Sequence, residues 1–146
     1  MSQLTAMLCT IAVEVPVCVV LAFLLGVFAP PAAALRSIAS SPGSASESEI
    51  HRAVQVALRV RFARLVVTSA GMSALTHPLL WNAALWWYSQ GWSPTTGLWT
   101  LEALVTLAEA ALLRLGAAVP WRQALLLSIA ANAASVAVGI CLTWQR

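Results

Sequence analysis

Four long apolar stretches alternate with short polar ones along this sequence. The apolar stretches cover residues 4–27, 65–85, 98–119 and 124–142, and few polar side chains interrupt each of them. A helix of about 20 residues, rising about 1.5 Å per residue, crosses a hydrocarbon core of about 30 Å. The pattern therefore predicts an all-α polytopic membrane protein with four transmembrane helices, which form a single membrane domain over residues 1–146.

Proline, glycine and serine mark the expected connections between these helices. Pro30 and Pro31 are expected to end the first helix, and residues 36–64 form a basic segment in two parts. The first part is a polar loop, and from Ile50 to Arg64 a helix is expected to enter through the headgroup region with its arginines extended toward water. Residues 91–97 predict a tight turn, and Gly116 with Pro120 marks the last connection.

The composition excludes a water-soluble domain and the distribution of charge predicts an orientation. Hydrophobic residues make up 60% of the chain and charged residues 9%, with a mean hydropathy of +0.84. Seven of the eight arginines fall in the first and third connections and their flanks, and only Arg146 falls on the opposite side. Because short cytoplasmic loops are enriched in arginine, both termini are expected on the non-cytoplasmic side of a bacterial inner membrane. The expected interfacial tryptophans on that side are Trp86, Trp87, Trp92, Trp99 and Trp144.

Several classes of function lack their sequence signatures. The arginines flank apolar segments and form no continuous basic face, so a nucleic-acid partner is not expected. Three cysteines lie within apolar segments without a CxxC spacing, which excludes a disulfide scaffold, a redox motif and a zinc ribbon. No nucleophile elbow or phosphate-binding glycine loop is present, so no catalytic residue is predicted.

The informative residues are the polar ones within the apolar stretches. A charged side chain at the centre of a bilayer costs about 3 kcal/mol on insertion scales, so such residues are kept for structural or functional reasons. Glu102 and Glu109 are seven residues apart and therefore share one face of their helix. Together with neutral Asn132, these residues form the predicted proton or cation site: Glu14, His77, Glu102, Glu109 and Asn132.

Two prolines lie beside these ionisable groups. Pro16 follows Glu14 by two residues, and Pro78 follows His77 directly. A proline within a helix frees one backbone carbonyl group and favours a kink. Since transporters use irregular backbone to line sites at membrane depth, the two kinks support a functional interpretation, although proline is also common in membrane helices.

Small and polar residues form a stripe on two of the predicted spans. Such stripes let membrane helices approach closely and form hydrogen bonds, so packing within the chain or between copies is their expected role. The stripe of the second span contains Ser69 and Ser73 and continues to His77; that of the fourth contains Ser128, Asn132, Ser135 and Gly139.

Four local patterns carry a resemblance to known proteins. Glu14-Val15-Pro16, Thr76-His77-Pro78-Leu79-Leu80-Trp81, the Glu102–Glu109 pair and Asn132-Ala133-Ala134-Ser135 resemble those of a group of small uncharacterised bacterial four-helix membrane proteins. That resemblance implies a fold but no activity. A glutamate within the first helix is also similar to that of small multidrug resistance transporters, in which such a carboxyl group exchanges protons for cationic drugs. The glycine motif of the third span in that family is missing here, and Glu14 alone corresponds to it.

Three functions remain open from the sequence. The leading hypothesis is a small proton- or cation-handling transporter, or a subunit of a transport complex, that uses the Glu/His site and functions as a homo-oligomer or with another membrane protein. A bilayer favours the neutral forms of both carboxyl and imidazole groups, which suits a proton relay. The alternatives are an accessory or assembly subunit without activity and an intramembrane enzyme dependent on a divalent metal. No cofactor is predicted for the first two.

Overall fold

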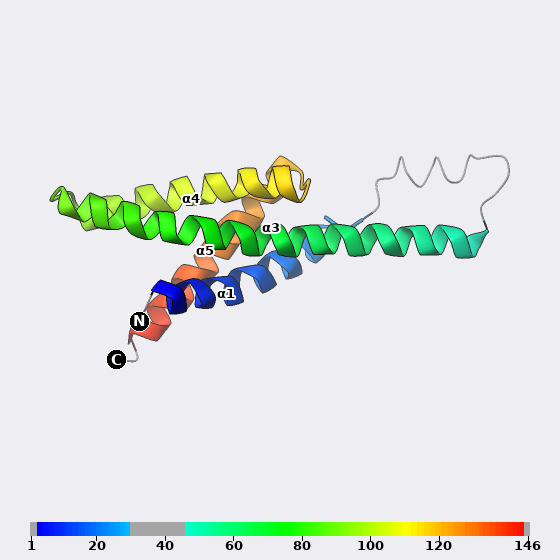
Figure 1. Ribbon diagram of the computed structural model, residues 1–146, viewed down its shortest axis with the longest axis horizontal. Helices are drawn as coiled ribbons and strands as arrows, with labels where there is room; N and C mark the ends of the chain where they lie inside the picture. The colour runs from blue at the N-terminus through cyan, green and yellow to red at the C-terminus, as the bar shows by residue number, and fades with distance from the viewer. Residues whose placement is uncertain (1–2, 30–45, 145–146) are drawn as a thin grey trace.

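The computed structural model describes residues 3–29 and 46–144, and it forms four α-helices and no strand within these ranges. The helices are α1 (Gln3–Leu24), α3 (Glu47–Ser89), α4 (Pro94–Gly116) and α5 (Trp121–Trp144) (Figure 1). The prediction of an all-α fold is confirmed. Residues 30–45, which include Pro30, Pro31, Arg36 and most of the predicted polar loop, lie outside the described residues.

Successive helices run in alternating directions, as chains that cross a membrane repeatedly do (Figure 1). α3 packs against α1 and α4, and α5 packs against the same two helices. Each helix thus has two neighbours, and α1 and α4 occupy opposite positions in the bundle. With 43 residues α3 is roughly 65 Å long, and its N-terminal part, before Arg61, extends beyond the other three helices.

Two of the four helices are long and apolar enough to cross a membrane. The two candidate segments are Met7–Leu24 in α1 and Trp121–Cys141 in α5, which correspond to the first and last predicted spans. α3 and α4 are also long enough, but each contains more polar residues, among them Glu102, Glu109 and Arg114 in α4. Whether α3 and α4 could also cross a membrane therefore depends on whether their polar side chains are buried inside the bundle.

α1 ends earlier than expected because of a glycine. Gly26 has a φ of 67°, a left-handed conformation that glycine adopts without steric cost. The Val27 N–H donates to the Ala22 carbonyl and the Gly26 N–H to the Phe23 carbonyl, which is the Schellman arrangement of a helix end. The predicted end near Val27, before the two prolines, is therefore wrong by three residues.

α3 is a single uninterrupted helix. Ser46 caps it through a reciprocal pair of bonds with Glu49: the serine hydroxyl accepts from the Glu49 N–H, and the Glu49 carboxylate accepts from the Ser46 N–H. The predicted headgroup helix of residues 50–64 and the predicted span of residues 65–85 are thus collinear parts of one element.

Aromatic rings occupy the turn between α3 and α4. Trp87 donates its indole N–H to the Ser93 carbonyl, and its ring covers Gly97, where a Cβ would lie only 2.7 Å from indole atoms. Trp92 meets the rings of Trp86 and Trp87 edge-on, with centroids 5.4 and 4.7 Å apart. The predicted tight turn therefore brings these tryptophans together at one end of the bundle.

In the connection between α4 and α5, glycine allows close packing of helices and does not supply the left-handed turn that its position near a helix end suggests. Gly116 is the final residue of α4, and the left-handed residue of the turn is Ala118, with a φ of 55°. A Cβ at position 116 would lie 2.7 Å from the Thr68 hydroxyl oxygen of α3. Close approach of α4 to α3, rather than backbone conformation, is what requires glycine here.

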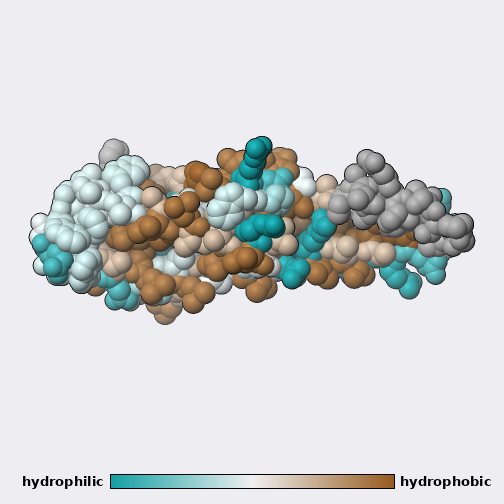
Figure 2. Space-filling view, turned by 90° about the horizontal axis from the view of Figure 1, so that it is seen from above, coloured by the Kyte–Doolittle hydropathy of each residue, from teal (hydrophilic) through white to brown (hydrophobic). Residues whose placement is uncertain are grey.

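Several polar side chains lie inside the bundle beside an apolar core, and many large apolar side chains lie on its outer surface. The buried face of α1 presents one residue per turn: Thr10, Glu14, Cys18 and Ala22. Leucine, valine and tryptophan dominate the outer surface, for example Val67 at 71%, Leu79 at 69% and Trp99 at 71% exposed. Figure 2 shows brown hydrophobic residues over much of one face, with hydrophilic teal residues gathering from its centre toward the end where α3 projects.

Candidate functional site

Glu14 lies at the centre of the bundle and is only 2% exposed. Four-residue spacing from Thr10 to Cys18 aligns it with the buried face of α1, which packs on α3 and α5. Its carboxyl group accepts a hydrogen bond from the Ser73 hydroxyl at 2.5 Å, and Ser135 of α5 lies within hydrogen-bonding reach. Both neighbouring helices therefore contact this carboxyl group through serine.

Glu109 enters the same interior from α4 and is 1% exposed. One carboxyl oxygen is 2.9 Å from the Thr76 hydroxyl of α3, and the other is 2.5 Å from the Asn132 amide nitrogen of α5. Ser128 lies 3.3 Å from that second oxygen. Side chains of two flanking helices thus converge on one carboxyl group.

The two glutamates come from opposite helices and meet the same turn of α3, since Ser73 and Thr76 are three residues apart. Neither glutamate has a basic partner among the described residues. Arg114, five residues after Glu109 on the same helix, is exposed rather than paired with it. A pair of buried carboxyl groups without a counter-ion is costly in the charged form.

Three hydroxyl groups in this cluster each have a second acceptor besides the glutamate. Ser73 lies 3.0 Å from the Ser69 carbonyl, Thr76 lies 2.9 Å from the Met72 carbonyl, and Ser128 lies 2.9 Å from the Thr106 carbonyl. A hydroxyl has one proton to donate and can also accept. It can therefore donate to a carboxylate, or donate to the helix carbonyl while accepting from a protonated carboxyl group.

His77 is half-buried and contacts α1 rather than either glutamate. Its Nε2 atom is 2.9 Å from the Thr10 hydroxyl oxygen, one helical turn along α1 from Glu14. The predicted cluster is thus split into a central part, Glu14 with Glu109 and Asn132, and a flanking part at His77. Glu102 is half-buried and has no side-chain hydrogen bond within residues 3–29 and 46–144.

Both predicted kink prolines lie on outer surfaces. α1 continues through Pro16 and α3 continues through Pro78, and both proline side chains are exposed. Pro16 and Pro78 lie within two residues of Glu14 and His77, but their side chains face outward. They therefore do not line the polar interior.

Most residues of the small and polar stripes face the interior of the bundle, whereas Gly139, near the end of α5, faces outward. Ser69, Ser73 and Ser128 are fully buried inside the chain, so they face the interior rather than a second copy. Ser135 is half-buried, and Gly139 is exposed with open space where a Cβ would lie.

Sequence reasoning overlooked the role of the hydroxyl groups. Thr10 and Thr76 contact the ionisable residues, and Ser128, expected only to pack, also approaches Glu109. The available signal was the four-residue spacing of Thr10 from Glu14, Ser69 from Ser73, and Ser128 from Asn132. Such spacing aligns polar groups on one face but does not say which neighbouring helix they meet.

Within the described part of the chain, no group of three or more histidine, cysteine, aspartate or glutamate side chains is arranged to hold a metal ion. Comparison with known proteins adds no relative: no protein-family model, no curated protein and no solved structure matches this chain.

Proposed function

We propose that this chain crosses a bacterial inner membrane four times and that Glu14 and Glu109 take up and release a proton, or exchange it for a cation, in a small transporter or a subunit of a transport complex. The observation that carries the proposal is the pair of carboxyl groups, 2% and 1% exposed, held by hydroxyl and amide groups without a basic partner.

The distribution of polarity supports four spans. Ser69, Ser73, Thr76 and Glu109 lower the apolarity of α3 and α4, and all of them are buried. Between residues 65 and 85 of α3 and between residues 98 and 113 of α4, many of the exposed side chains are large and apolar, including Val67, Leu79 and Leu104. A bundle with polar groups inside and large apolar residues outside is stable in lipid and exposes too much apolar surface for water. The arginines of the described residues lie away from the tryptophan-rich turn, which supports termini on the non-cytoplasmic side.

The hydroxyl groups support a role of the two glutamates in proton exchange rather than a purely structural role in holding the helices together. Because Ser73, Thr76 and Ser128 can reverse their hydrogen bonds, the cluster is satisfied whether the carboxyl groups are charged or neutral. A proton can therefore come and go without leaving an orphaned polar group. A purely structural contact gains nothing from this reversibility.

A surface groove next to Thr76 supports access to this site. This residue lines a shallow groove of about 230 Å³ between α3 and α4, whose other walls are apolar residues such as Leu79 and Leu104. Thr76 links the groove to Glu109, because its hydroxyl lies 2.9 Å from the Glu109 carboxyl group. Because four helices enclose little further space, we propose that a second copy or another membrane protein completes the pathway.

The test is proton flux in vesicles that contain the purified protein and a trapped pH-sensitive dye. Wild-type protein is expected to dissipate an imposed pH gradient, and Glu14→Gln and Glu109→Gln are each expected to lower the rate at least tenfold. Glutamine keeps the shape and the hydrogen bonds of the neutral carboxyl group but carries no exchangeable acidic proton. The variants should therefore fold.

Glu47→Gln is the matched control, since it makes the same change at an exposed position in the first turn of α3. It should leave the flux unchanged. Flux in wild-type vesicles that both interior variants retain would contradict the proposal.

One observation favours a second candidate, an accessory subunit that docks a partner. The projecting part of α3 exposes Val56 and Val60, at 54% and 52%. Under this alternative the interior polar groups only fasten the helices, so Glu14→Gln and Glu109→Gln would lower stability and co-purification with a partner, and wild-type vesicles would show no flux.

A further inference from the structure

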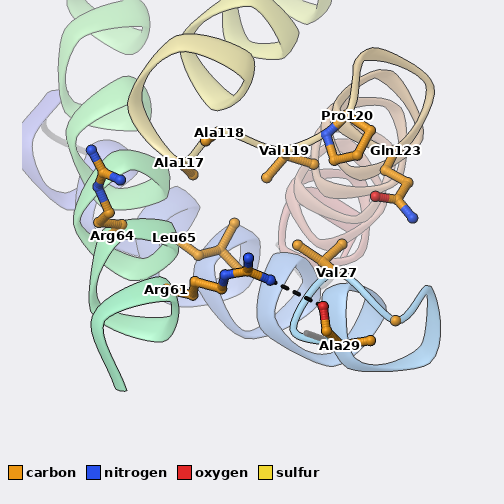
Figure 3. Close-up of a pocket in the computed structure, with 11 residues that line it drawn as sticks. Val27, Ala29, Arg61, Arg64, Leu65, Ala117, Ala118, Val119, Pro120 and Gln123 are labelled. Atoms are coloured by element: carbon orange, nitrogen blue, oxygen red, sulfur yellow. Dashed lines mark hydrogen bonds between the residues drawn. The ribbon is translucent and has the colours of Figure 1, made fainter. Parts of the chain in front are cut away.

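A cavity of about 430 Å³ opens at the end of the bundle opposite the tryptophan-rich turn. Its walls come from the end of α1, the middle of α3, the α4–α5 connection and the first turn of α5 (Figure 3). Its volume falls within the range of about 300–1,000 Å³ that is usual for small-molecule sites.

The cavity is positively charged. Arg61 and Arg64 of α3 both line it, and none of the lining residues is acidic. Arg61 reaches across to the Ala29 carbonyl at 3.0 Å, as the dashed line in Figure 3 shows, and this bond occupies only one of its five N–H donors. Arg114 and Arg122 flank the same connection, one in the last turn of α4 and one in the first turn of α5. Four arginines therefore surround this end without a carboxylate partner among the described residues.

The α5 side of the cavity contributes both donors and an unused acceptor. α5 begins at Trp121, so the unpaired N–H groups of its first turn and the positive end of its dipole lie here. Gln123 donates from Nε2 to the Leu25 carbonyl at 3.0 Å, and its Oε1 atom is buried without a hydrogen-bond partner. An orphaned buried acceptor is costly, and a ligand that carries a hydroxyl group supplies the missing donor.

We propose that this cavity binds the phosphate group of an anionic phosphoester that also carries free hydroxyl groups. Arginine is the preferred partner of phosphate because its planar guanidinium donates two parallel hydrogen bonds. Basic pockets between helices at the cytoplasmic face bind anionic headgroups in the same way. Two sources supply this chemistry: the headgroup of phosphatidylglycerol and a water-soluble glycerol phosphate. The site is separate from Glu14 and Glu109 and does not depend on their function.

Native mass spectrometry of the full chain tests this proposal. The protein is released from detergent after incubation with equal amounts of phosphatidylglycerol and phosphatidylcholine of the same acyl length. Wild-type protein is expected to retain phosphatidylglycerol in at least fivefold excess, and Arg61→Gln with Arg64→Gln should bring the ratio close to one. Arg64→Gln alone should lower it partly, and within residues 3–29 and 46–144 this side chain has no hydrogen bond that folding would lose.

Arg52→Gln is the matched control, because it removes the same charge from an exposed position of α3 outside the cavity. It should leave the ratio unchanged. A second arm adds glycerol phosphate: displacement of the lipid identifies the phosphate group and its hydroxyls as the recognised part, whereas retention identifies the intact lipid as the ligand. Equal retention of both lipids by wild-type protein, or an equal loss with Arg52→Gln, would overturn the proposal.

Discussion

At the scale of single residues, the two interior glutamates are defined by their partners. Hydroxyl and amide groups hold them, and Ser73, Thr76 and Ser128 can each donate a hydrogen bond either to the carboxyl group or to a helix carbonyl. The positions of Glu14 and Glu109 were predictable, because a carboxyl group inside an apolar stretch stands out by its cost alone. Their partners were not, since the match of Thr76 to Glu109 depends on how α3 and α4 pack.

Two substitutions of Glu109 separate the contribution of its hydrogen-bonded shape to stability from that of its ionisable group. Glu109→Ala should lower the free energy of unfolding in micelles by about 3 kcal/mol, because it leaves a cavity and removes the acceptor of Asn132. Glu109→Gln should cost less than about 1 kcal/mol, since an amide meets the same groups. Reversible unfolding followed by circular dichroism measures both.

Glu102→Ala is the control for this comparison. Glu102 is half-buried on the same helix and has no side-chain hydrogen bond within the described residues, so its loss should cost well under 1 kcal/mol. A cost equal to that of Glu109→Ala would contradict the interpretation of the Glu109 contacts.

At the scale of helices, close approach between α3 and α4 fixes the interior geometry. The apolar pattern predicted all four helices, but their ends depended on glycines whose roles differ: Gly26 adopts a left-handed turn and Gly116 admits Thr68. Sequence alone shows a glycine near a helix end in both cases. The difference arises from a neighbour on another helix.

Gly116→Ala should therefore destabilise the protein by about 1 to 3 kcal/mol, since the added Cβ overlaps the Thr68 side chain. Gly71→Ala is the matched control on α3, where nothing lies within 4 Å of a Cβ. That substitution should be neutral or stabilising by up to about 1 kcal/mol, because alanine favours helix more than glycine does. Thermal unfolding in the same detergent compares them, and an equal response of both variants would contradict the packing argument.

At the scale of the whole molecule, large apolar side chains cover much of the outer surface, and the interior holds an apolar core together with the polar cluster around Glu14 and Glu109. The two ends differ: tryptophans gather at one, and Arg61, Arg64, Arg114 and Arg122 lie at the other. If α3 crosses the membrane, residues on either side of its span face different compartments.

Thiol labelling in intact cells tests this orientation. In a background with Cys9, Cys18 and Cys141 replaced by alanine, Ser93→Cys should react with a membrane-impermeant reagent added outside the inner membrane. Ala53→Cys, exposed in the projecting part of α3, should react only after the membrane is permeabilised. Labelling of both from the same side would contradict a crossing by α3.

The central claim is that Glu14 and Glu109 exchange protons inside the bundle, and infrared difference spectroscopy of the protein in lipid tests it most directly. A change of pH should convert protonated carboxyl C=O bands into carboxylate bands reversibly. Glu14→Gln and Glu109→Gln should each remove one component, and Glu47→Gln should remove only signal from the exposed surface. Interior bands that do not respond to pH, or that persist in both variants, would contradict the claim.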